Sequence, residues 1–193
     1  MFGPLPISPE ELLSKLIPAV LKYVDNNKDQ TGENTNWTLA VKESLKSILA
    51  ECSRETRCFY TNAEPGMKEF MLDLLWWTND GSDGALLACE CEWFFAGRSN
   101  EDSYFNEVGE DFSKLLVFKA PLKLMIFATP PEIPAIEFSV IKEINRYLYA
   151  YKHHVAGETY LVLDFARVPK AWISKIEQDG ASQPTLRQLP IQL

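Results

Sequence analysis

Histidine and basic side chains are scarce in this sequence, and each shortage restricts the chemistry it can support. His153 and His154 are the two histidines, adjacent near the end of an expected helix. Histidine interacts well with the dipole at a helix C-terminus, so we expect both to cap the helix or face solvent rather than bind a metal. Lysine and arginine number 19 against 27 acidic residues, a net charge of -8. This excludes a surface built for broad electrostatic capture of nucleic acid, while a local basic groove stays open.

Cysteine is also sparse, and the four cysteines lack the CxxC spacing of a zinc site. Cys89 and Cys91 alternate with Glu90 and Glu92 along an expected strand, which puts the thiols on the face opposite the acids. Free cysteine is common in protein cores. We therefore predict reduced core thiols and no structural zinc.

Several familiar patterns are missing altogether. The sequence has no GxGxxG fingerprint, no Walker loop and no GxSxG elbow, which removes the common signals for dinucleotide, nucleotide and acyl-transfer chemistry. No apolar run of about 18 residues predicts a membrane span, and there is no signal peptide pattern or secretory cysteine spacing. We expect a cytoplasmic protein that does not enter a membrane.

The chain of 193 residues, 46% of them hydrophobic, is long enough for one domain with a substantial core. We predict a single domain over residues 1–193, with its core at about 37–165 and an N-terminal helix at 8–24. A peripheral tail follows at 168–193. Its weak alternation leaves two alternatives open, a hairpin or a frayed end.

Helix and strand patterns alternate along the chain. Ser8, Pro9 and Glu11 form a helix start, with a cap, a proline at the first helical position and a glutamate three residues after the cap. Further helices are expected at 37–55, from about 103 to Pro121 and at 132–154. Strands are expected at 57–61, 69–78, 84–95, 122–129 and 158–166. This order predicts an α/β (α+β) fold with a central mixed β-sheet flanked by helices.

The helix near 103–120 presents an apolar stripe to the core. That stripe comprises Phe105, Val108, Phe112, Leu115 and Leu116. Glu107, Glu110 and Lys114 are expected to face outward, and Lys119 to project near the buried side at the helix end.

The most informative stretch is a hairpin of two expected strands joined by the turn-like run NDGSDG. In a symmetric hairpin the residue numbers of facing partners have a constant sum, here 163, as for Gly81 and Ser82. Asp73 then faces Glu90, and Glu92 lies on the same side because strand side chains alternate. Facing residues are about 5 Å apart at Cβ, a distance at which like charges repel.

Two readings of these acids remain open. They can be the solvated face of an antiparallel sheet. Alternatively they hold a divalent cation, because the same face carries Leu75 and Trp77 and would partly desolvate them. Crowding should raise at least one of their pKa values, and replacing Asp73 or Glu90 should then leave the metal-free protein equally or more stable.

The order helix, strand, strand, strand, helix, strand over about residues 37–129 resembles the αβββαβ core of the PD-(D/E)XK nuclease superfamily, the restriction-endonuclease-like fold. Members of that superfamily typically hydrolyse phosphodiester bonds in nucleic acid with a divalent metal. The resemblance implies that Asp73 stands for the motif aspartate and Glu90 for the second acid. Both would then be ligands of Mg²⁺ or Mn²⁺, since hard cations prefer carboxylate oxygens.

Two positions depart from the motif. Leu72 replaces the proline before the aspartate, and Glu92 occupies the position of the motif lysine. That lysine is expected to position the nucleophile or stabilise developing charge. Lys119 or Lys68 then reaches in from elsewhere, or Glu92 supports a second metal, or the site is inactive.

Three functional hypotheses follow. The first is a metal-dependent nuclease-like protein acting on nucleic acid, with Asp73, Glu90, Glu92 and Lys119 as catalytic candidates. The second is a catalytically inactive member of the same fold that binds a protein partner or regulates one. The third is an unrelated α/β domain in which the acids are incidental. Fold resemblance alone does not decide among them.

Overall fold

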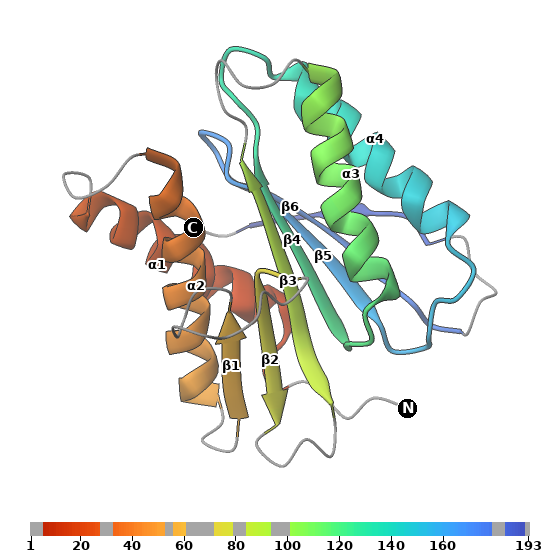
Figure 1. The fold of residues 1–193 in the computed structure, drawn as a ribbon, viewed down its shortest axis with the longest axis horizontal. Coiled ribbons are helices and arrows are strands. Elements are labelled where there is room, and N and C mark those ends of the chain that lie inside the picture. The colour runs from red at the N-terminus through yellow and green to blue at the C-terminus, as the bar shows by residue number, and fades with distance from the viewer. Residues whose placement is uncertain are drawn as a thin grey trace.

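The structure is a computed structural model that describes residues 6–27, 33–52, 56–60, 72–78, 84–93, 101–178 and 184–191. Within these ranges a seven-stranded mixed sheet is flanked by four helices (Figure 1). The helices are α1 (Pro9–Asn26), α2 (Glu33–Cys52), α3 (Glu101–Val117) and α4 (Ala135–Ala150). The strands are β1 (Thr56–Tyr60), β2 (Leu74–Thr78), β3 (Ala85–Trp93), β4 (Leu122–Ala128), β5 (Thr159–Asp164), β6 (Lys170–Lys175) and β7 (Arg187–Leu189). The predicted mixed sheet with flanking helices is confirmed.

The strands lie side by side in the order in which they occur along the chain. β1, β2 and β3 form an antiparallel meander, and β5, β6 and β7 form a second one. Between them β3, β4 and β5 run parallel. Parallel neighbours need crossover connections, and α3 and α4 are those crossovers.

Helices cover both faces of the sheet, so each face has its own apolar core (Figure 1). On one face α1 and α2 pack against residues that include Trp76, Cys89 and Ile126. On the other face α3 and α4 pack against Leu75, Met125 and neighbouring residues. The parallel strands are therefore buried on both sides, as such strands usually are.

The first helix begins where the sequence predicts it. Ser8 accepts a hydrogen bond from the Glu11 backbone N–H at 3.1 Å, and Pro9 occupies the first turn. The last helix is shorter than predicted. α4 ends at Ala150 because Tyr151 is extended, with φ -73° and ψ 127°. Of the two alternatives predicted for the histidines, capping the helix or facing solvent, His154 follows the first: its Nε2 lies 2.8 Å from the backbone oxygen of Leu148 in the last turn, and its side chain is buried.

The C-terminal tail forms a hairpin, one of the two alternatives left open. β6 pairs with both β5 and β7, so it lies within the sheet. Its residues Trp172 and Ile173 are buried on opposite faces. The expectation that the whole tail is peripheral is therefore wrong for residues 170–175.

The register of the central hairpin matches the predicted sum. Leu74 pairs with Cys89, and Trp76 with Leu87. A bulge between Trp76 and Trp77 then shifts the register toward the turn. Asp73 directly precedes β2, level with Glu90 in this register.

Candidate acid site

Asp73 is held by partners from two other elements. Its Oδ1 lies 2.9 Å from Nζ of Lys42 on α2, and its Oδ2 accepts a hydrogen bond from the Cys91 backbone N–H at 2.9 Å. The Lys42 side chain is 8% exposed and that of Asp73 is 22% exposed. Desolvation strengthens a pairing of this kind. Asp73 thus also helps to join α2 to β3.

Glu90 occupies the middle of β3 and is only 3% exposed. Nζ of Lys114 on α3 lies 3.4 Å from Glu90 Oε1, an electrostatic contact that does not satisfy hydrogen-bond geometry. Burial raises the pKa of Glu90 to about 8, with further increases from the charges of Asp111 and Asp73. Burial therefore favours the protonated form of Glu90, and the charge of Lys114 opposes this effect.

Glu92 lies two residues further along β3, on the same side. Burial raises its pKa to about 8, and a hydrogen bond with Asp111 contributes. Its Oε1 accepts a hydrogen bond from the Trp93 backbone N–H at 3.2 Å. The pKa values of Glu90 and Glu92 are both raised, with desolvation as the largest cause. Repulsion within the predicted trio contributes at Glu90, through Asp73, whereas the acids that act on Glu92 are Asp111 and Glu107.

Helix α3 supplies two residues that the sequence reasoning did not assign to the site. Asp111 interacts with Glu90 and Glu92 and forms an ion pair with Lys114. The expectation that Lys114 faces away from the core is wrong, because its ammonium group lies beside Glu90. A sequence signal existed, since Glu107, Asp111 and Lys114 follow i, i+4, i+7 spacing along one margin of the apolar stripe.

The structure places Lys119 at the other end of the parallel strands. Its Nζ contacts the backbone oxygen of His153 at 3.1 Å and lies 3.9 Å from Glu158 Oε1. Glu158 directly precedes Thr159, which pairs with Leu122 at the start of β4. Lys119 is therefore not brought together with Asp73 and Glu90. Lys68, the other lysine candidate, lies outside the described residues.

A further buried acid, Asp164, is fully engaged in the structure. Its two carboxylate oxygens accept hydrogen bonds from the backbone N–H and the hydroxyl of Thr129, at 2.8 and 2.7 Å. These bonds join the ends of β5 and β4. We assign Asp164 a structural role for this reason.

No family model matches this sequence, and no match was found among curated proteins or among solved structures.

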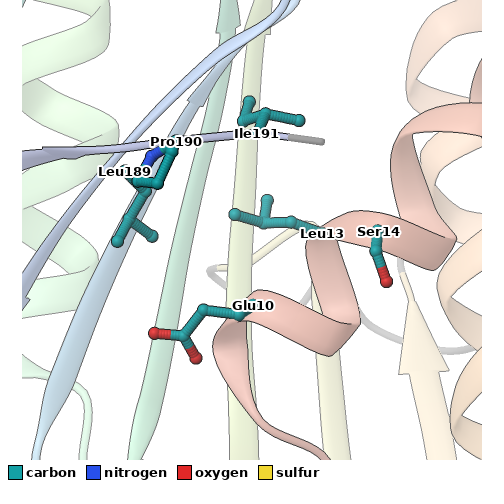
Figure 2. Close-up of a pocket in the computed structure, with 6 residues that line it drawn as sticks. All are labelled: Glu10, Leu13, Ser14, Leu189, Pro190 and Ile191. Atoms are coloured by element: carbon teal, nitrogen blue, oxygen red, sulfur yellow. The ribbon is translucent and has the colours of Figure 1, made fainter. Parts of the chain in front are cut away.

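Two surface pockets lie away from the acid site. One, of about 180 Å³, lies between α1 and the end of the chain; Glu10, Leu13 and Ser14 line one side, and Leu189, Pro190 and Ile191 the other (Figure 2). The second, of about 520 Å³, follows α1 and α2 and includes Lys15, Tyr23 and Glu51. Neither pocket is lined by Asp73, Glu90 or Glu92.

The donor set can be compared with the needs of a divalent cation. In the described parts of the chain, no group of three or more His, Cys, Asp or Glu side chains is arranged to hold a metal ion. Mg²⁺ does not require such a group, because it is usually held by one or two carboxylates, several waters and substrate phosphates. Glu90 Oε1 is buried without a hydrogen bond in the described structure, so it has a lone pair to offer. Asp73 and Glu90 thus fit a Mg²⁺ or Mn²⁺ ion in number and chemistry.

Among the helices that the structure describes, none has the length and apolarity needed to cross a bilayer.

Proposed function

We propose that this protein is a metal-dependent nuclease-like protein that hydrolyses phosphodiester bonds in nucleic acid, with a restriction-endonuclease-like core from α2 to β4. The observation that carries the proposal is the buried Glu90 carboxylate, one strand away from Asp73. Its Oε1 has no hydrogen bond in the described structure, and a lysine stands beside it. The order α2, β1, β2, β3, α3, β4 is consistent with the proposed core.

In this proposal Asp73 and Glu90 are the protein ligands of Mg²⁺ or Mn²⁺. The bound ion would polarise the phosphoryl group and lower the pKa of its bound water. Glu92 can hold or release a proton near neutral pH, because its pKa is raised to about 8.

Lys114 takes the role expected of the missing motif lysine, in place of Lys119. Its side chain is 37% exposed, so it can reach a phosphate at the surface while remaining next to Glu90. An ammonium group in that position stabilises negative charge that develops on the phosphoryl oxygens.

One observation favours the second candidate function, a catalytically inactive protein-binding or regulatory module. Asp73 and Glu90 each already have a lysine beside them, Lys42 and Lys114. Two built-in cations can offset the acid charges in place of a metal. The two candidates therefore differ in whether a divalent ion displaces these contacts.

Metal titration separates the two candidates. Wild-type protein is titrated with Mg²⁺ or Mn²⁺ while thermal unfolding is followed, and cleavage of single- and double-stranded DNA and RNA is assayed in parallel. At a hundredfold excess over Kd, a bound ion should stabilise the fold by about 2.7 kcal/mol. Asp73→Asn and Glu90→Gln should remove both the stabilisation and the cleavage. Glu110→Gln, on the exposed side of α3, is the matched control and should retain both.

Absence of metal-dependent stabilisation and of cleavage in wild type, together with strong destabilisation by Asp73→Asn, would contradict the nuclease proposal. Asp73 would then be a structural partner of Lys42, and the binding-module function would replace the nuclease proposal.

A further inference from the structure

Four polar side chains form a buried cluster at the end of the parallel strands opposite the acid site. Lys123, Glu158, Tyr160 and His154 are each at most 4% exposed. Nζ of Lys123 lies 2.8 Å from Glu158 Oε1 and donates hydrogen bonds to the Tyr160 hydroxyl at 3.0 Å and the Leu116 backbone oxygen at 3.3 Å. Such a cluster is stable in the core only if its charges and protons are matched.

The backbone fixes one proton on His154. Its Nε2 lies 2.8 Å from the backbone oxygen of Leu148, which can only accept, so Nε2 carries a hydrogen. In the neutral ring Nδ1 is therefore an acceptor, and it lies 3.1 Å from the Tyr160 hydroxyl.

Tyr160 has one hydroxyl proton and two acceptors at the same distance. Glu158 Oε2 and His154 Nδ1 each lie 3.1 Å from its oxygen. While His154 is neutral, the hydroxyl can donate to either acceptor. When it donates to Nδ1, Glu158 Oε2 still accepts from the Val155 backbone N–H at 3.2 Å. Once Nδ1 is protonated it must donate to the hydroxyl oxygen, and the hydroxyl proton then points to Glu158.

We propose that His154, Tyr160, Glu158 and Lys123 form a proton-operated latch. Protonation of His154 turns the Tyr160 hydroxyl proton from Nδ1 of His154 toward Glu158 and leaves an uncompensated positive charge in the core.

The surrounding charges set the direction of the response. Glu158 is the carboxylate facing His154 in the cluster, at 4.0 Å from Nδ1. Lys123 of β4 and Lys119 after α3 approach the same carboxylate, and Tyr151 contacts the imidazole edge-on with ring centroids 5.0 Å apart. His153 is the exposed chain neighbour. Burial lowers the pKa of His154, and the charges of Lys123 and Lys119 lower it further, against the opposing effects of the hydrogen bond to the Leu148 oxygen and the charge of Glu158.

The latch joins the ends of both crossover helices to the starts of the parallel strands. His154 binds the Leu148 oxygen at the end of α4, and Lys123 binds the Leu116 oxygen at the end of α3. Protonation should therefore weaken the hold of the connection 151–158 on the sheet. A histidine with a lowered folded-state pKa binds its proton more readily in the unfolded chain, so stability is lost as pH falls below about 6.5.

NMR of the ring nitrogens of wild-type histidines tests the latch directly, because it reports the tautomer and protonation of each ring. The chain has two histidines, so the signals that remain in His153→Gln belong to His154. Above pH 7.5, His154 should be the Nε2–H tautomer, and Nδ1 should gain a proton with a midpoint below 6.5. Denaturant unfolding between pH 7.5 and 5 is the second measurement. Glu90 and Glu92, with raised pKa values, stabilise the fold as pH falls over this range, so the His154 contribution is the difference between wild type and His154→Gln. Each unit by which the His154 midpoint is lowered should reduce the wild-type folded-to-unfolded ratio about tenfold at low pH, relative to that variant.

His154→Gln should lose this acid-dependent change in the ratio, whereas His153→Gln should keep it. An Nδ1–H tautomer at high pH, or a His154 midpoint at or above 6.5, would overturn the latch. So would a wild-type pH response in His154→Gln. If His154→Gln does not fold, the NMR titration of wild type and His153→Gln still decides, since neither protein alters the latch.

Discussion

Asp73 and Glu90 are neighbouring carboxylates that the structure treats differently. Asp73 forms an ion pair with the buried Lys42 and accepts a backbone hydrogen bond from Cys91. Glu90 is more buried, and its Oε1 makes no hydrogen bond among the described residues. Removing the negative charge should therefore have opposite effects at the two positions.

Replacing Asp73 with Asn should destabilise the metal-free protein by about 1–3 kcal/mol, because the buried Lys42 loses its ion pair with this carboxylate. This revises the expectation that loss of either acid leaves stability unchanged or improved. Urea unfolding at pH 7 measures the change. Glu11→Gln breaks the exposed pair with Lys15 and should change stability by less than about 0.5 kcal/mol. Equal stability of Asp73→Asn and wild type would show that Lys42 does not depend on Asp73.

Replacing Glu90 with Gln should stabilise the metal-free protein at pH 8–9 and have little effect near pH 4.5. The folded-state pKa is raised from 4.5 to about 8, so the folded protein binds the extra proton and loses stability as pH rises between these values. Each unit of such a shift corresponds to about 1.4 kcal/mol. Unfolding curves for both proteins across pH 4–9 provide the measurement. Parallel pH dependences would contradict the raised pKa of Glu90.

At the scale of elements, α3 presents its polar margin to the acid site. If Lys114 stabilises developing charge, Lys114→Met should abolish cleavage while metal-dependent stabilisation persists, since the oxygen ligands remain. Lys142→Met, on the exposed side of α4, should retain both. Unchanged cleavage by Lys114→Met would remove that lysine from the mechanism without affecting the metal site.

Strand β3 has acids on one face and thiols on the other. Cys89 and Cys91 are buried and free, with their sulfurs 3.9 Å apart. Cys89→Ser should destabilise the protein by about 1–3 kcal/mol, because a hydroxyl enters an apolar core. Cys89→Ala should destabilise it less, because alanine brings no polar atom into that core. Elemental analysis should find no stoichiometric zinc. One tightly bound zinc per chain would overturn the core assignment of these thiols.

Local signals were sufficient to predict most elements but not all of their neighbours. The cap at Ser8 and the constant pairing sum placed α1 and the β2–β3 register, because both depend on nearby residues. Lys114 was predicted to face outward, and the burial of His154 was not predicted. Their burial depends on partners distant in sequence, Glu90 on β3 and Tyr160 on β5, which helical periodicity cannot reveal.

At the scale of the whole molecule, the two ends of the sheet carry different polar networks. The acid site involves the start of β2 and the middle of β3, and the His154 cluster lies where β4 and β5 begin. Helix α3 contacts both, through Lys114 and through the backbone oxygen of Leu116. Substitutions in the two networks should therefore be tested together for additivity, because residues sharing one rigid element can couple.

The alternation of antiparallel and parallel pairing also bears on how the chain assembles. The antiparallel neighbours β1–β2, β2–β3 and β5–β6 are close in sequence, whereas β3–β4 and β4–β5 pairing requires α3 and α4 to be spanned first. Closing a short loop is faster than bringing together distant segments. We expect the two flanking meanders to form early and the central parallel pairings to complete last, so the rate-limiting step of folding should lie in the middle of the sheet.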